Sequence, residues 1–210
     1  MVSIDLFSSS RRHARIPFLE EQAFQWYTSF DPLGELIDRP NPTPAIQLLA
    51  RIVAHLTNDC DWPISNIHFF GFAQGGSVAT EFVLKHWRDE LSIQQKALPS
   101  DATSSTLPEK RFGSIVSVGG PLLSYPTLSK PCPTPLLIFH RPSPSDSALP
   151  TGAVAAMKKG FTKVEEVQKR GEGMPRSQVE FEPIMRFWSE HLARRQMEGL
   201  YEVMSGMASR

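Results

Sequence analysis

The stretch Ile67-His68-Phe69-Phe70-Gly71-Phe72-Ala73-Gln74-Gly75-Gly76-Ser77-Val78-Ala79 decides the fold of this chain. A short apolar run leads into a glycine-flanked corner, and an amphipathic segment follows it through Leu84. This pattern predicts a buried strand that turns sharply into a helix. The glycines let strand and helix approach closely, and the residue at the corner itself is Ala73.

The rest of the chain indicates a mostly parallel sheet that is flanked by helices. Apolar runs at residues 112–120 and 134–140 predict buried strands, and residues 2–7 and 162–167 predict two further strands. Helical spacing predicts a helix that Thr43 caps, a helix that runs from the corner to about Leu91, a short helix at 154–159 and a closing helix at 181–196. We therefore expect the α/β fold class.

Length and composition favour one domain. The chain has 210 residues, of which 40% are hydrophobic, which is enough for one sizeable core. We expect a single domain over residues 1–210, with a polar surface insertion at 94–110 and a tail at 197–210, because both segments lack hydrophobic periodicity. Trp26 and Tyr27 belong to an irregular aromatic segment that we interpret as a plug over one sheet edge. The same aromatic side chains would also suit the wall of an acyl pocket.

Charge and cysteine content narrow the classes of partner. Lys plus Arg and Asp plus Glu number 22 each, so no overall field favours nucleic acid or an anionic membrane. No apolar stretch approaches the roughly 20 residues of a membrane span. Cys60 and Cys132 lie far apart without a metal-ligand spacing, which predicts a reducing, cytoplasmic location and no metal. The sequence indicates no cofactor.

The corner also carries a resemblance to a known family. Gly71-Phe72-Ala73-Gln74-Gly75-Gly76 resembles the G-F-S-Q-G-G elbow of the phospholipase/carboxylesterase and acyl-protein thioesterase family of α/β hydrolases, with alanine in place of the nucleophilic serine. The resemblance covers roughly residues 15 to 195. It implies an α/β-hydrolase-like fold, ester or thioester substrates and a catalytic triad whose positions can be sought in this chain.

The resemblance implies four site positions, and two of them carry the wrong chemistry. Ala73 stands where the nucleophile belongs, and the backbone N–H of Gln74 would donate to an oxyanion. Asp146, in a loop similar to the family's D-x-x-V-P loop, stands for the acid. Met174 occupies the place of the histidine base, and a thioether cannot take a proton from a hydroxyl at neutral pH. His191 lies in the closing helix, where we interpret it as a packed or rim histidine.

The N-terminal part departs from the family as well. Family members carry a His-Gly-rich loop after their first strand, and this loop supplies the second oxyanion donor. No glycine occurs before Gly34 in this chain. We therefore expect an N-terminally shortened fold without the His-Gly strand, and a sheet edge left open for a second copy or a partner protein.

The sequence is compatible with three hypotheses about function. The first is an inactive member of the family, a pseudoenzyme that uses its fold to bind an acyl or ester molecule or a protein. The second is an ester or thioester hydrolase with an unorthodox or incomplete site, for which Ser77 is the alternative nucleophile. The third is a shortened product whose open edge pairs with another chain.

Overall fold

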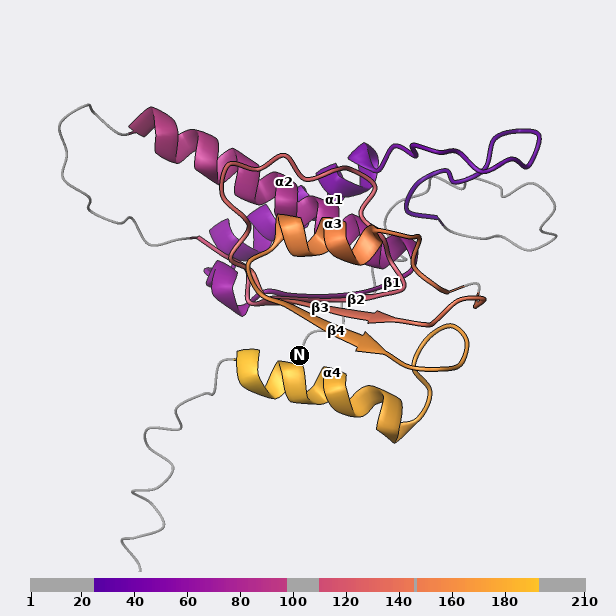
Figure 1. Cartoon of the computed structure of the whole chain (residues 1–210). Coiled ribbons are helices and arrows are strands. Elements are labelled where there is room, and N and C mark those ends of the chain that lie inside the picture. Colours follow the sequence, from indigo (N-terminus) through magenta and orange to yellow (C-terminus); the bar gives the residue numbers. More distant parts are fainter. Residues whose placement is uncertain (1–24, 98–109, 146, 193–210) are drawn as a thin grey trace, which may run out of the picture.

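The computed structural model describes residues 25–97, 110–145 and 147–192. Four parallel strands lie in chain order: β1 (His68–Phe72), β2 (Ser114–Val118), β3 (Leu136–His140) and β4 (Val164–Gln168). Helices α1 (Thr43–Asn58), α2 (Gln74–Ala97) and α3 (Ala153–Gly160) cover one face of the sheet, and α4 (Gln178–His191) covers the other (Figure 1). This is the α/β architecture that the sequence predicts.

The two central strands are buried throughout, as their continuous apolar runs predict. Strand β1 differs, because it lies at an edge of the described sheet and no described strand pairs with its outer side. The side chains of Phe70 and Phe72 are 40% and 42% exposed. The prediction that the strand before the corner is fully buried is therefore wrong for this face.

Alternation along the strands divides the core into two layers. Leu136 and Ile138 of β3 point toward α1, α2 and α3 and join the larger cluster. Leu137 and Phe139 point the other way and pack with α4. His140 follows Ile138 on the larger side, and the next residue, Arg141, follows Phe139 on the α4 side.

The starts of two helices, α1 and α4, differ in detail from the sequence prediction. Thr43 does not cap α1; instead the Asn41 side chain accepts a hydrogen bond from the Thr43 backbone N–H at 3.0 Å. Helix α4 begins at Gln178 rather than at residue 181, because Ser177 and Glu180 form a reciprocal capping box. The Ser-x-x-Glu spacing of these two residues is a signal that would have located this helix start.

Helix α2 is longer than predicted and ends at Ala97. The first four residues of the expected surface insertion, 94–97, are therefore helical, and residues 98–109 lie outside the described part of the chain. The predicted strand at residues 2–7, Asp146 and the tail at 197–210 also lie outside it. Within the described ranges, no helix combines the length and the apolar character needed to cross a membrane.

Candidate functional site

The corner between β1 and α2 has a backbone that alanine rarely adopts. Ala73 has a φ of 48°, in the left-handed region, and is exposed to solvent. Its N–H donates to the Val118 carbonyl at 2.8 Å, and its own carbonyl accepts from Ser77 N–H at 3.1 Å. The corner residue is thus held by backbone hydrogen bonds, and its methyl group stands at the carboxyl edge of the sheet.

Glycines make this corner possible by allowing backbone to touch backbone. A Cβ atom at Gly71 would lie 2.3 Å from the Gly75 carbonyl carbon, and one at Gly120 would lie 2.5 Å from the Ala73 carbonyl oxygen. Real Cβ atoms do not approach backbone this closely. Gly71 and Gly120 therefore bring the ends of β1 and β2 and the start of α2 into direct contact.

Gln74 fastens the aromatic segment to the corner. Its side-chain oxygen accepts from Trp26 N–H at 2.9 Å, and its side-chain nitrogen donates to the Tyr27 carbonyl at 3.2 Å and to Ser29 Oγ at 2.7 Å. Trp26 and Tyr27 pack against the larger core cluster. The aromatic segment thus covers the start of α2. As the first residue of α2, Gln74 also has a backbone N–H without an intrahelical acceptor.

Ser77 lies in the first turn of α2 and is completely buried. Its Oγ has no hydrogen-bond partner of good geometry among the described residues, although Tyr27 lies near it. Burial raises the pKa of Tyr27, the Ser77 hydroxyl opposes that rise, and the charge of Glu81 adds to it. Ser77 is therefore a core hydroxyl rather than one presented at the surface.

The loops that carry positions 146 and 174 meet at the same edge of the sheet. Asp146 itself is outside the described residues, but its two neighbours contact the second loop. Ser145 Oγ donates to the Glu172 carboxylate at 2.6 Å, and Ser147 Oγ accepts from Gly173 N–H at 2.9 Å. The structure therefore brings the predicted acid loop beside the loop that contains Met174.

Among the described residues, Met174 makes no polar side-chain contact at this edge. Its side chain is partly buried and packs against the cluster between the sheet and α4. The loop before it passes through two glycines with positive φ, Gly171 at 120° and Gly173 at 63°. A Cβ atom at Gly171 would lie 3.2 Å from the guanidinium of Arg141, so both its conformation and its surroundings favour glycine.

Arg141 organises this loop, and the sequence analysis missed it. Only 2% of its side chain is exposed, and its guanidinium donates to the carbonyls of Gly173 at 3.2 Å and Arg170 at 2.8 Å. It also forms an ion pair with Glu180 of α4. This bond, and then one from the Arg176 backbone, lower the pKa of Glu180 to about 2. The available signal was a basic residue directly after a buried strand.

The histidines in the described ranges do not approach the corner. His191 lies at the end of α4, where its Nδ1 lies 2.7 Å from the Phe187 carbonyl oxygen. It is close enough to His68, at the amino end of β1, to help lower the pKa of that residue, after the larger effect of burial. Both rings are thus at the edge opposite Ala73. His140 does reach the carboxyl edge, but β2 separates it from β1.

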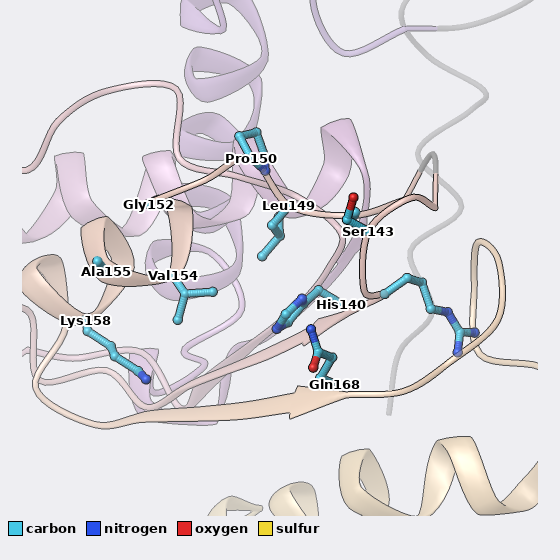
Figure 2. A pocket seen from close by; sticks show the side chains of 11 residues that line it. His140, Ser143, Leu149, Pro150, Gly152, Val154, Ala155, Lys158 and Gln168 are labelled. Atoms are coloured by element: carbon cyan, nitrogen blue, oxygen red, sulfur yellow. The ribbon is translucent and has the colours of Figure 1, made fainter.

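His140 instead faces a cavity of about 420 Å³ beside α3. Figure 2 shows His140 and Gln168 at the ends of β3 and β4, with Val154 and Lys158 reaching in from α3 and Leu149 above them. Glu166 accepts hydrogen bonds from Lys158 at 2.8 Å and from His140 at 3.2 Å, which together hold its pKa below the usual range. Among the described residues, no group of three or more His, Cys, Asp or Glu side chains is arranged to hold a metal.

Comparison with known proteins adds to this geometry. No family model matches the chain. A protein of Mycosarcoma maydis described as an uncharacterized hydrolase is 32% identical over 184 residues, which make up 86% of this chain and 63% of that protein. The chain thus spans less than two thirds of the length of this relative.

Three solved structures of esterases and thioesterases resemble the chain in fold. Each is 18% identical in sequence and covers 80% of this chain. Esterase PE8 has a TM-score of 0.57 with 71% of its length covered. Acyl-protein thioesterase 2 of Zea mays has a TM-score of 0.54 with 72% of its length covered. SOBER1 of Arabidopsis thaliana has a TM-score of 0.53 with 74% of its length covered. The chain therefore has the α/β-hydrolase-like fold, a parallel sheet flanked by helices, that it shares with these esterases and the acyl-protein thioesterase.

Proposed function

We propose that this chain is a catalytically inactive relative of the phospholipase/carboxylesterases, which keeps the fold to bind a small acyl or ester molecule or a partner protein. The observation that carries the proposal is Ala73, which is exposed at a φ of 48° where a nucleophile would be presented. A methyl group cannot attack a carbonyl carbon. The geometry of the corner is thus present without its reactive atom.

The base position supports the same conclusion. Met174 follows the glycine loop at the edge where a histidine would be needed, and its thioether is no base. In a serine hydrolase, loss of the nucleophile or the base alone lowers turnover by on the order of a million-fold. With both absent, we expect no ester hydrolysis above that of an unrelated protein.

The alternative nucleophile does not rescue catalysis. Ser77 is completely buried one turn into α2, and Gly120 is packed against its backbone nitrogen. A substrate carbonyl could reach Ser77 Oγ only after the elements packed around it, which include Tyr27 and the end of β2, had moved away. This placement favours the inactive function over an unorthodox serine hydrolase.

A ligand-binding role has a candidate place in the cavity beside α3. Its aliphatic lining, including Leu149, Pro150 and Val154, suits a short acyl chain, and His140 and Lys158 suit a carboxylate or ester oxygen. The cavity lies at the carboxyl ends of β3 and β4, which is where ligands of parallel sheets commonly bind. It is on the α3 side rather than directly beside Ala73.

The catalytic part of the proposal is tested with a fluorophosphonate probe and with p-nitrophenyl acetate. We expect no labelling of the wild-type protein, and no turnover that depends on Ser77 or Asp146. Hydrolysis that disappears in Ser77→Ala or Asp146→Asn would overturn the proposal. As a positive control, Ala73→Ser combined with Met174→His should gain probe labelling, whereas each single substitution should not.

The binding part is tested separately with hexanoate as the probe. Saturable binding should raise the thermal midpoint of the wild-type protein, because a ligand of the folded state stabilises it. Val154→Phe, which fills the cavity, should abolish this rise, and the exposed substitution Val179→Ala on α4 serves as the control. Equal rises in all three proteins would exclude this cavity as the binding place.

A further inference from the structure

The cavity beside α3 contains a nearly buried histidine with one ring nitrogen left to bind. His140 ends β3, is 7% exposed and lines the cavity of about 420 Å³. Its Nε2 lies 3.2 Å from a carboxylate oxygen of Glu166, whereas its Nδ1 makes no hydrogen bond to a described residue. A polar atom at a buried position is stabilised only when a ligand or water pairs with it. His140 Nδ1 is therefore the atom of this cavity that points to a ligand.

Glu166 decides which nitrogen of His140 carries hydrogen. Its hydrogen bonds from Lys158, at 2.8 Å, and from His140 hold its pKa below the usual range, so it is a carboxylate, which only accepts. His140 Nε2 is therefore the donor, and Nδ1 of the neutral ring keeps a lone pair. A ligand that pairs with this lone pair has to bring a hydrogen of its own.

A second polar group lies beside His140. Gln168 of β4 is its register partner on the adjacent parallel strand, and both side chains line the cavity (Figure 2). The Gln168 side chain makes no hydrogen bond to a described residue, so its amide N–H is available to donate. Adjacent strands lie about 4.8 Å apart. One acceptor and one donor thus stand about one strand spacing apart at the same cavity.

The permanent charges of the cavity lining already have partners. Lys158 is paired with Glu166, and the guanidinium of Arg141 is directed to Glu180 on the α4 side. A bare carboxylate would therefore meet no unpaired cation among the described lining residues, and an ester would bring no hydrogen for His140 Nδ1. A carboxylic acid group carries both a hydroxyl hydrogen and a carbonyl oxygen, and it matches the acceptor and the donor together.

We infer that this cavity binds a short-chain carboxylic acid together with one proton, with the acid hydroxyl on His140 Nδ1 and the carbonyl oxygen on the Gln168 amide. Leu149, Pro150 and Val154 supply an aliphatic wall for the alkyl chain. The same complex forms from a carboxylate and a protonated ring, because one proton then lies between the two groups. The inference rests on the ligand-binding part of the proposed function and narrows its ligand from acyl or ester molecules to the free acid.

The test compares hexanoate, methyl hexanoate and 1-hexanol by isothermal titration calorimetry. At pH 6, hexanoate should bind at least about tenfold more tightly than the ester, which has no hydrogen to donate. The affinity for hexanoate should also fall at least about tenfold between pH 6 and pH 8, because the complex holds a proton that is scarcer at the higher pH. The charged groups that the structure places around His140 are Glu166 of β4, Lys158 of α3 and the adjacent Arg141.

Two variants identify the binding groups. His140→Phe keeps a flat ring but removes Nδ1, and it should abolish saturable binding of hexanoate. Gln168→Met changes an exposed side chain of similar length, and it should weaken hexanoate binding severalfold even if His140→Phe proves unstable. Gln47→Met, on the exposed side of α1 away from this cavity, is the matched control and should bind hexanoate as the wild-type protein does.

The outcomes separate this inference from the proposed function. Methyl hexanoate or 1-hexanol that binds as tightly as hexanoate, an affinity equal at pH 6 and pH 8, or unchanged binding in Gln168→Met would each overturn the inference. If acid and ester bind equally and Val154→Phe abolishes both, the proposed ligand-binding role stands and only the inference fails. If none of the three probes binds, both fail.

Discussion

Two loops at the carboxyl edge of the sheet are held in opposite ways. The corner at Ala73 is fixed by backbone, through the close approach of Gly71 to Gly75 and the hydrogen bond from Ala73 to Val118. The loop before Met174 is fixed by one buried side chain, the guanidinium of Arg141. The contacts that hold the two loops come from backbone and from Arg141, whereas Ala73 and Met174 contribute no polar side-chain contact among the described residues. Under the proposed function, this is how the shape of a site is kept when its nucleophile and base are replaced.

The largest effect is expected where the corner is most crowded. Gly71→Ala places a methyl group 2.3 Å from the Gly75 carbonyl carbon, so β1 and α2 must separate. We expect the free energy of unfolding to fall by about 3–5 kcal/mol, measured by urea denaturation. Gly75→Ala is the matched control, since its nearest contact is the flexible Trp26 side chain at 3.4 Å. Similar losses in both variants would contradict a corner held by backbone contact.

A slightly smaller loss is expected at the second loop. Arg141→Met keeps the apolar stem but removes the donors to the loop carbonyls and leaves Glu180 without its ion-pair partner. We expect a loss of about 3 kcal/mol in urea denaturation, together with faster proteolysis between residues 169 and 174. Arg186→Met, which removes an exposed ion pair on α4, should change stability little. Unchanged proteolysis of the loop would show that something other than Arg141 holds it.

The ion pair of this loop should also appear in the pH dependence of stability. The pKa of Glu180 is about 2 in the folded protein against an ordinary value of 4.5. Its contribution is therefore complete above pH 4.5 and is lost as the pH falls toward 2. Glu180→Gln should remove this part of the acid destabilisation, whereas Glu182→Gln on the exposed face of α4 should not. Urea denaturation of the wild-type protein and of both variants between pH 2 and pH 6 measures this difference. If the free energy of unfolding falls equally with pH in all three proteins, Glu180 is not the group responsible.

The smallest effect is expected at the corner residue itself. Ala73→Gly relieves a left-handed backbone that costs alanine energy, so stability should rise by about 0.5–1 kcal/mol. The matched control is Ala50→Gly on the exposed side of α1, where glycine should cost about 1 kcal/mol. Thermal unfolding of the two variants measures both changes. A destabilised Ala73→Gly protein would mean that the Ala73 methyl group contributes packing that outweighs the strain.

The sequence predicted the parallel sheet and the corner because both depend on local patterns. Continuous apolar runs marked β2 and β3, and the glycines around Ala73 marked the turn into α2. Burial of β1 could not be read this way, since it depends on which strand lies beyond Phe70 and Phe72. The role of Arg141 was also hidden, because its carbonyl partners follow some 30 residues later in the chain and no spacing rule connects them. The functional roles of Asp146 and Met174 stay predictions that the proposed substitutions test.

Arg141 also joins two places that the sheet otherwise keeps apart. It lines the cavity on the α3 side, while its guanidinium bonds the loop carbonyls and Glu180 on the α4 side. A molecule that enters the cavity therefore touches the residue on which the far loop depends. One buried side chain thus belongs both to the wall of the cavity on the α3 side and to the support of the loop on the α4 side.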